Sequence, residues 1–134
     1  MAWAVKVSTD ELALMMEAGL IYRYARKFRE AREVFEGVRA LRPQSEVPQI
    51  ALGSVEFDEG RFQEAIRHYQ KAIGLNPRSA YAYAQLGEAQ LFHMDKQAAR
   101  ASLEKALELD PKGEPANLAR MLLKLTDQVE FRHS

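Results

Sequence analysis

The sequence contains no cysteine, so disulfides, thiolate metal ligands and cysteine nucleophiles are all excluded. It also lacks any run approaching the ~18 apolar residues that a membrane span requires. The first residues do not form the long apolar segment of a secretory signal peptide. We therefore expect a protein that does not insert into membranes and stays in the cytoplasm of the cell that makes it.

An excess of either charge is missing too. The 19 basic and 19 acidic side chains cancel, and no five like charges follow one another. Nucleic acids and anionic membrane surfaces bind through summed positive charge, so we expect neither as the main partner. The densest basic cluster is interleaved with glutamates at helical spacing, which predicts a solvated face with internal ion pairs. Its residues are Arg23, Arg26, Lys27, Arg29 and Arg32, with Glu30, Glu33 and Glu36.

Motifs for catalysis or cofactor binding are absent as well. No two of the three histidines, His68, His93 and His133, stand four residues apart, and no HExxH string occurs. No GxGxxG or GK[ST] string offers a phosphate-binding loop. The sequence therefore predicts no active site, no cofactor and no metal site.

What the sequence does contain is a helical hairpin pattern in residues 46–79. Gly53 is a small residue where a second helix could cross closely, and Gly60 suits a left-handed turn between two helices. Pro77 would end the second helix because it has no amide hydrogen. Bulky and small residues alternate along that helix and suit a tight seam: Phe62, Ala65, Tyr69 and Ala72.

The same pattern recurs 34 residues earlier and 34 residues later. Prolines stand at 43, 77 and 111, and Gly53 has counterparts in Gly19 and Gly87. From Leu12 to Gly113, this period and these positions resemble the tetratricopeptide repeat family. The sequence departs from the family pattern at the inter-helix glycine, which is Arg26 in the first repeat and Met94 in the third.

The resemblance implies an all-α fold, a right-handed α-solenoid of three helix-turn-helix hairpins in a single domain, 1–134. The repeats would span about 12–45, 46–79 and 80–113, followed by a capping helix at about 114–126 and a tail, 127–134. A final helix normally covers the apolar end of such a stack. We expect helices at about 9–24, 27–41, 46–59, 61–75, 80–93, 96–109 and 114–126. Side-chain caps are expected at Ser8, Ser45, Ser79 and Asp95.

The resemblance also implies a concave groove formed by the first helix of each repeat. Matching to the family pattern predicts these groove-facing residues: Ala13, Met16, Leu20, Arg23, Tyr24, Val47, Ile50, Ser54, Phe57, Asp58, Tyr81, Ala84, Glu88, Leu91 and Phe92. Most are apolar or aromatic, which favours a partner protein that lays an apolar helical or extended segment in the groove. Some of them could instead be core between repeats, Leu20 and Leu91 above all.

One ligand class of the family is disfavoured. Members that hold the C-terminal carboxylates of heat-shock chaperones use lysine, asparagine and arginine at fixed groove positions. The matching residues here are Met16, Leu20, Ala51, Tyr81 and Gln85, and none is positively charged. A carboxylate placed there would lose its hydration without compensation.

Two functional interpretations remain. In size, neutrality and groove character the chain is similar in plan to the tetratricopeptide chaperones of bacterial type III secretion, which hold apolar export subunits in the cytoplasm. Alternatively, it is a scaffold part of a larger bacterial assembly or a homodimer that pairs through the groove or the leucine-rich residues 114–126. The roles of Trp3 and of those surplus leucines stay open.

Overall fold

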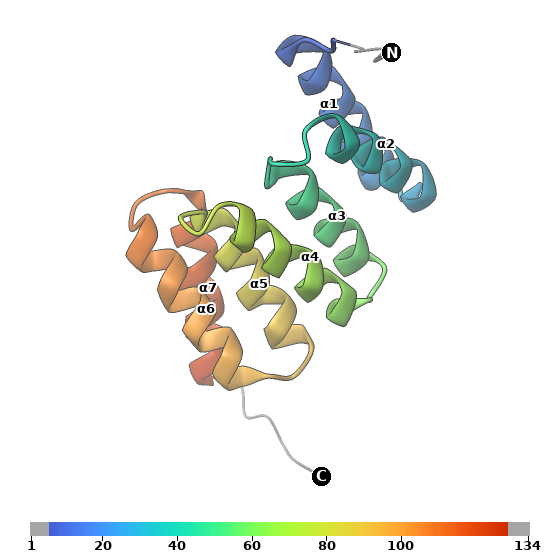
Figure 1. Ribbon diagram of the computed structural model, residues 1–134. Coiled ribbons are helices and arrows are strands. Elements are labelled where there is room, and N and C mark those ends of the chain that lie inside the picture. The colour runs from blue at the N-terminus through green and yellow to red at the C-terminus, as the bar shows by residue number, and fades with distance from the viewer. Residues whose placement is uncertain (1–5, 129–134) are drawn as a thin grey trace.

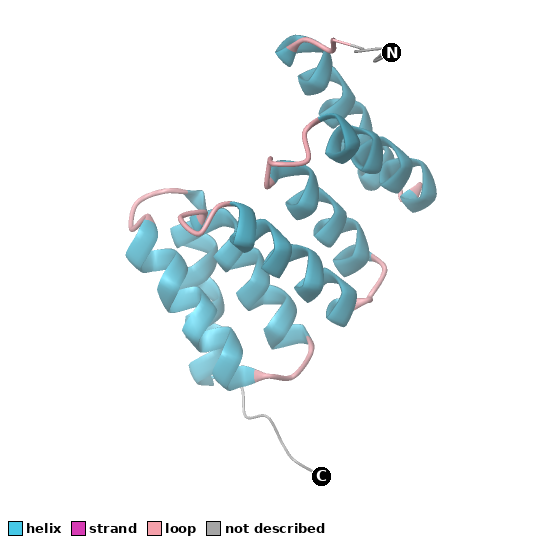
Figure 2. Ribbon diagram, viewed as in Figure 1, coloured by secondary structure: helices cyan, strands magenta, loops and turns pink. Residues whose placement is uncertain are grey.

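A computed structural model describes residues 6–128 of the chain. Within this range the chain forms seven α-helices and no strand, and short loops join the helices (Figure 2). They are α1 Thr9–Tyr24, α2 Phe28–Leu41, α3 Val47–Asp58, α4 Phe62–Leu75, α5 Ala80–Phe92, α6 Lys96–Leu109 and α7 Glu114–Gln128. None of these helices is long and apolar enough to span a membrane.

The helices stack as three antiparallel hairpins and a cap. The pairs α1/α2, α3/α4 and α5/α6 are the hairpins, and each hairpin packs on the next through α2 against α3 and α4 against α5. Helix α7 packs on both α5 and α6, so α1 and α7 lie at opposite ends of the stack (Figure 1). This is the solenoid of hairpins that the sequence predicts.

The predicted helix bounds agree closely with the structure, and the main error is at the end of α7. That helix continues to Gln128, so the expectation of a tail beginning at residue 127 is wrong. Asp127 is helical and forms an ion pair with Arg100 of α6, which ties the last turn to the stack. The predicted Ser8 capping box forms, and Ser79 and Asp95 cap α5 and α6. Trp3 lies outside the described residues.

The three hairpin turns share one backbone geometry. Arg26, Gly60 and Met94 all have positive φ angles, of 60°, 76° and 65°. In each turn the amide of this residue donates to the carbonyl three residues earlier, and the next amide donates five residues back. This Schellman pattern satisfies carbonyls at the end of the first helix. Non-glycine residues therefore adopt the glycine turn in the first and third repeats.

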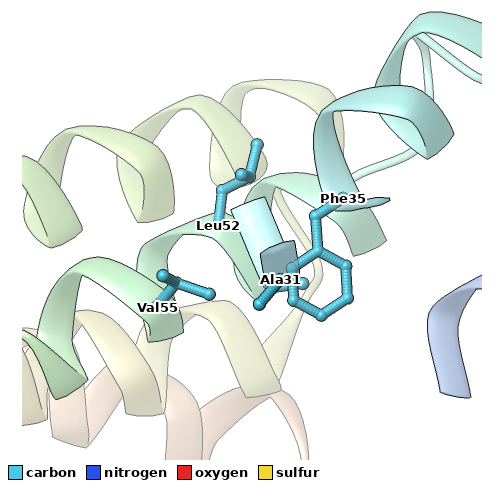
Figure 3. Packing of buried hydrophobic residues seen from close by; sticks show 5 residues of the cluster. Ala31, Phe35, Leu52 and Val55 are labelled. Carbon is cyan, nitrogen blue, oxygen red and sulfur yellow. The ribbon is translucent and has the colours of Figure 1, made fainter. Parts of the chain in front are cut away.

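Each hairpin is held by a bulky side chain that lies on a glycine. A Cβ atom added to Gly53 would lie 2.5 Å from Cε1 of Tyr69, and one added to Gly87 would lie 2.6 Å from Leu103. Phe35 lies on Gly19 in the same way. The core continues between hairpins, where Ala31 and Phe35 of α2 pack against Leu52 and Val55 of α3 (Figure 3).

Arg32 of the basic cluster forms an ion pair between repeats, which the sequence does not suggest. Arg29 makes the expected pairs within its helix, with Nε at 3.6 Å from Glu30 and 3.8 Å from Glu33. Arg32 instead reaches across to α3, where its Nε lies 3.1 Å from a carboxylate oxygen of the buried Glu56. The other Glu56 oxygen lies 3.0 Å from Arg61. The prediction of a solvated face is therefore wrong for Arg32, which joins two repeats.

Candidate functional site

A pocket of about 280 Å³ lies between α1 and α3, and the start of α5 closes one side of it. We call it the N-terminal pocket. Its walls are mostly apolar, and two of its large side chains are close to half exposed, Val47 at 48% and Tyr81 at 47%. It is lined by Met16, Leu20, Arg23, Glu46, Val47, Ile50, Ala51, Ser54, Ser79 and Tyr81.

Several side chains serve both the core and the groove. Met16 and Leu20 are partly buried against the cluster of Phe35, Leu52 and neighbouring residues, yet both also line the N-terminal pocket. Ile50 likewise packs on the cluster that contains Tyr69 and Leu86, and it also lines the pocket. The sequence leaves open whether Leu20 belongs to the core or to the groove, and in the structure this residue belongs to both.

An ion pair crosses the groove beside this pocket. Arg23 of α1 holds Asp58 of α3 with two bonds, Nε at 2.5 Å and Nη2 at 3.2 Å from the two carboxylate oxygens. Burial acts to lower the pKa of Arg23, and the hydrogen bond and charge of Asp58 outweigh this and raise it. The guanidinium is therefore already neutralised, and it is not a free anchor for a ligand carboxylate.

Ser54, which also lines this pocket, is satisfied by hydrogen bonds within the protein. Ser54 is buried, and its hydroxyl donates to the Ile50 carbonyl at 3.1 Å. Its oxygen also lies 3.2 Å from the hydroxyl of Tyr69, whose pKa is raised by burial. Because these partners are built in, the N-terminal pocket offers a ligand mainly apolar surface.

A second pocket, of about 430 Å³, lies between the end of α5 and α7. We call it the C-terminal pocket. Three of the predicted groove residues line it, namely Glu88, Leu91 and Phe92. The rest of its lining was not among the predicted groove residues: Met94, Met121, Leu122, Leu125 and Thr126. For the residues of α7, the signal was that the apolar residues of 114–126 cover more than one helix face.

The remaining predicted groove residues lie outside both pockets. Phe57 packs edge-on against Phe62 and Phe92, with ring centroids 5.3 and 5.1 Å away, and thus belongs largely to the contact between repeats. Tyr24 is exposed and lies beside Arg23, and Asp58 is held by the same arginine. Ala13 is also exposed, whereas Ala84 is buried in the core.

Residues 6–128 contain no group of three or more histidine, aspartate and glutamate side chains that could hold a metal ion. His68 Nδ1 lies 2.9 Å from the side-chain oxygen of Gln49, and burial lowers its pKa, with Lys71 adding to the effect. His93 is exposed at the end of α5. His133 lies outside the described residues.

Comparison with known proteins agrees with the stack of helical hairpins. A TPR repeat family model matches residues 53–91, and a tetratricopeptide repeat model matches residues 80–112. No curated protein sequence matches the chain. Among solved structures, PcrH from Pseudomonas aeruginosa has a TM-score of 0.81 at 18% identity, over 95% of this chain and 99% of PcrH.

Two further similar structures contain bound peptides. The Yersinia enterocolitica type III secretion chaperone SycD, in complex with a peptide of the translocator YopD, has a TM-score of 0.78 at 17% identity, covering 92% of this chain and 97% of SycD. The first TPR of Spaghetti (RPAP3), bound to an HSP90 peptide, has a TM-score of 0.78 at 23% identity, covering 93% and 97%. At these identities the likeness is one of fold. Residues 53–112 therefore match tetratricopeptide repeat models, and the described chain has the fold of tetratricopeptide repeat proteins.

Proposed function

We propose that this protein is a protein-interaction module, not an enzyme, and that its groove binds an apolar helical or extended segment of a partner protein. The N-terminal pocket carries the proposal. Its exposed apolar side chains lie beside partly buried ones, and burying them under a ligand would remove apolar surface from water. Its one arginine is already paired with Asp58, which disfavours a ligand anchored by a carboxylate.

The finer proposal is that the protein is a bacterial secretion chaperone, acting in the cytoplasm on an apolar export subunit. Its support is the shared fold with SycD, which is a translocator chaperone and was solved with a translocator peptide. An apolar groove suits that task, because masking an apolar segment prevents its aggregation. The alternative of a scaffold part in a larger bacterial assembly shares the groove but not the export partner.

Two substitutions in the N-terminal pocket test the interaction. Tyr81→Glu and Val47→Glu place a charge where an apolar ligand would lie, and both side chains are about half exposed, so the fold should tolerate them. We expect each to weaken binding of peptides selected on the wild-type chain at least about tenfold. Binding would be followed by fluorescence anisotropy, and helicity by circular dichroism.

The matched control is Leu75→Glu, which changes an exposed leucine at the end of α4 outside both pockets. It should bind peptides as the wild type does. Equal affinity in all three variants would contradict groove binding. Phe57 is left unchanged because its ring packs between Phe62 and Phe92, so its replacement would disturb the fold.

An exposed apolar row on α1 favours self-association as a second candidate. Leu14 and Ile21 are 65% and 67% exposed and lie seven residues apart, hence on one helix face, with Ala18 and Ala25 between and after them. Such a row is typical of a helix that pairs with another helix. One SycD structure is described as an alternative dimer.

Sedimentation equilibrium tests this candidate. We expect a dimer at high micromolar concentration that Leu14→Gln with Ile21→Gln disperses, while Met121→Gln with Leu125→Gln on α7 leaves it intact. A dimer dispersed only by the α7 pair would place the interface there, as the leucine-rich sequence suggested. A wild-type monomer would remove the candidate.

A further inference from the structure

The C-terminal pocket contains one charged residue among its lining, Glu88. Within residues 6–128, no hydrogen bond or ion pair from another side chain reaches its carboxylate. The cation whose charge acts on it is Arg23, and that guanidinium is already held by both oxygens of Asp58. Arg23 thus has two carboxylates near it, those of Asp58 and Glu88. It pairs with Asp58, and the carboxylate of Glu88 has no ion-pair partner among the described residues.

An unpaired carboxylate is unfavourable in this position. Glu88 is partly buried, and its neighbours along the pocket are Leu91, Phe92, Met121 and Leu125. Burial raises the pKa of Glu88, Arg23 lowers it, and Asp58 raises it further. Removing a charge from water without a partner costs free energy, and a cation brought beside it would offset that cost.

Both pockets have lining residues on one face of α5. Tyr81 lines the N-terminal pocket and Glu88 lines the C-terminal pocket. These residues are seven apart, so they lie on the same side of the helix, about 10 Å from each other along its axis. A polypeptide segment of a few extended residues is long enough to contact both side chains at once.

We propose that the groove prefers partner segments in which one lysine or arginine stands beside apolar residues, and that Glu88 receives this cation. The neighbouring apolar side chains fill the space between the end of α5 and α7. Glu88 is then a specificity residue and the pocket supplies most of the buried area. This inference rests on the proposed function, namely that the groove binds a segment of a partner protein.

Selection from a displayed library of random peptides tests it, with the full chain and its Glu88→Gln variant as targets. We expect peptides selected on the wild type to be apolar and enriched in lysine or arginine near one position. Peptides selected on Glu88→Gln should remain apolar and lose that enrichment. Glu104→Gln, on the exposed face of α6, is the matched control and should keep it.

A double-mutant cycle then measures the pairing. In the tightest selected peptide, changing the basic residue to the neutral norleucine should weaken binding to the wild type about three- to tenfold. The same change should have little effect on Glu88→Gln, because the partner charge is gone. A coupling indistinguishable from zero would overturn the role of Glu88.

The possible results distinguish the charge preference at Glu88 from the proposed groove binding on which it rests. Apolar peptides without basic enrichment would overturn the charge preference and leave groove binding intact, whereas no enrichment of apolar peptides would overturn both. Much tighter peptide binding in a full-length Phe131→Ser, Arg132→Ser variant would make the chain's own C-terminal residues the occupant. A wild-type dimer that selected peptides disperse would make a second copy the occupant. Either result would overturn the assignment to a partner protein.

Discussion

At the scale of single residues, the turn positions show how backbone geometry overrides side-chain type. Arg26, Gly60 and Met94 occupy the same left-handed conformation, although only glycine adopts it without steric cost. The cost at an ordinary residue is roughly 1–2 kcal/mol. In the first and third repeats the hydrogen bonds of the turn and the packing of the hairpins offset that cost.

Met94→Gly should therefore stabilise the protein by roughly 0.5–1 kcal/mol, because it relieves the strained φ angle. The Met94 side chain is 63% exposed, so little buried area is lost. The reciprocal change, Gly60→Ala, should destabilise by about 1 kcal/mol, although a Cβ there meets no atom within 4 Å. Urea denaturation of both variants measures the effects. A lower midpoint for Met94→Gly would show that packing of the methionine outweighs backbone strain.

At the scale of the element, the hairpin depends on close approach at one glycine. The Tyr69 ring of α4 lies directly on Gly53 of α3 and is fully buried, and its hydroxyl contacts Ser54. The ring therefore has little freedom to move. The helices can lie this close only because α3 has no side chain at that point.

Gly53→Ala should destabilise the protein by roughly 1–3 kcal/mol, because the added methyl group would overlap the Tyr69 ring. Gly74→Ala in α4 is the matched control. No atom lies within 4 Å of a Cβ there, so higher helix propensity should stabilise by roughly 0.5–1 kcal/mol. Thermal and urea unfolding would measure both. Equal effects of the two variants would refute the argument from close approach.

At the scale of the whole molecule, the stack is unevenly buried along its length. Helix α1 contains one buried residue, Gly19, whereas α3 is buried along most of its length. The other end is covered, because α7 packs on α5 and α6. In a solenoid each repeat is stabilised mainly by its neighbours, so a terminal helix with few buried contacts opens most easily.

Native-state hydrogen exchange should show this gradient. Amides of α1 are expected to exchange through local opening at a lower free energy than amides of α3 and α5, which should exchange only with global unfolding. Because α1 forms one wall of the N-terminal pocket, a peptide bound there should slow exchange in α1 more than in α6. Uniform protection across all seven helices would contradict the gradient.

The sequence alone determined the helices and their order, because local signals set them. The turn at Gly60, the caps at Ser8, Ser79 and Asp95, and the prolines each act within a few residues, and the 34-residue period repeats the hairpin pattern along the chain. The contact between Gly53 and Tyr69 can also be predicted from the sequence, because the repeat pattern fixes which helix faces meet. The end with the largest error, that of α7, is held by the ion pair of Asp127 with Arg100, 27 residues away.

Only the tertiary structure decided how the groove is divided. The repeat pattern places residues on the first helix of each repeat. It does not show that Phe57 and Phe92 pack on Phe62, or that Arg23 forms an ion pair with Asp58. It also does not show that α7 adds Met121 and Leu125 to a pocket with Glu88. Apart from Phe57 with Phe62, these contacts join residues about 30 or more positions apart, and no local periodicity encodes them. The unpaired charge of Glu88 follows from those contacts, because whether a carboxylate has a partner depends on every helix around it.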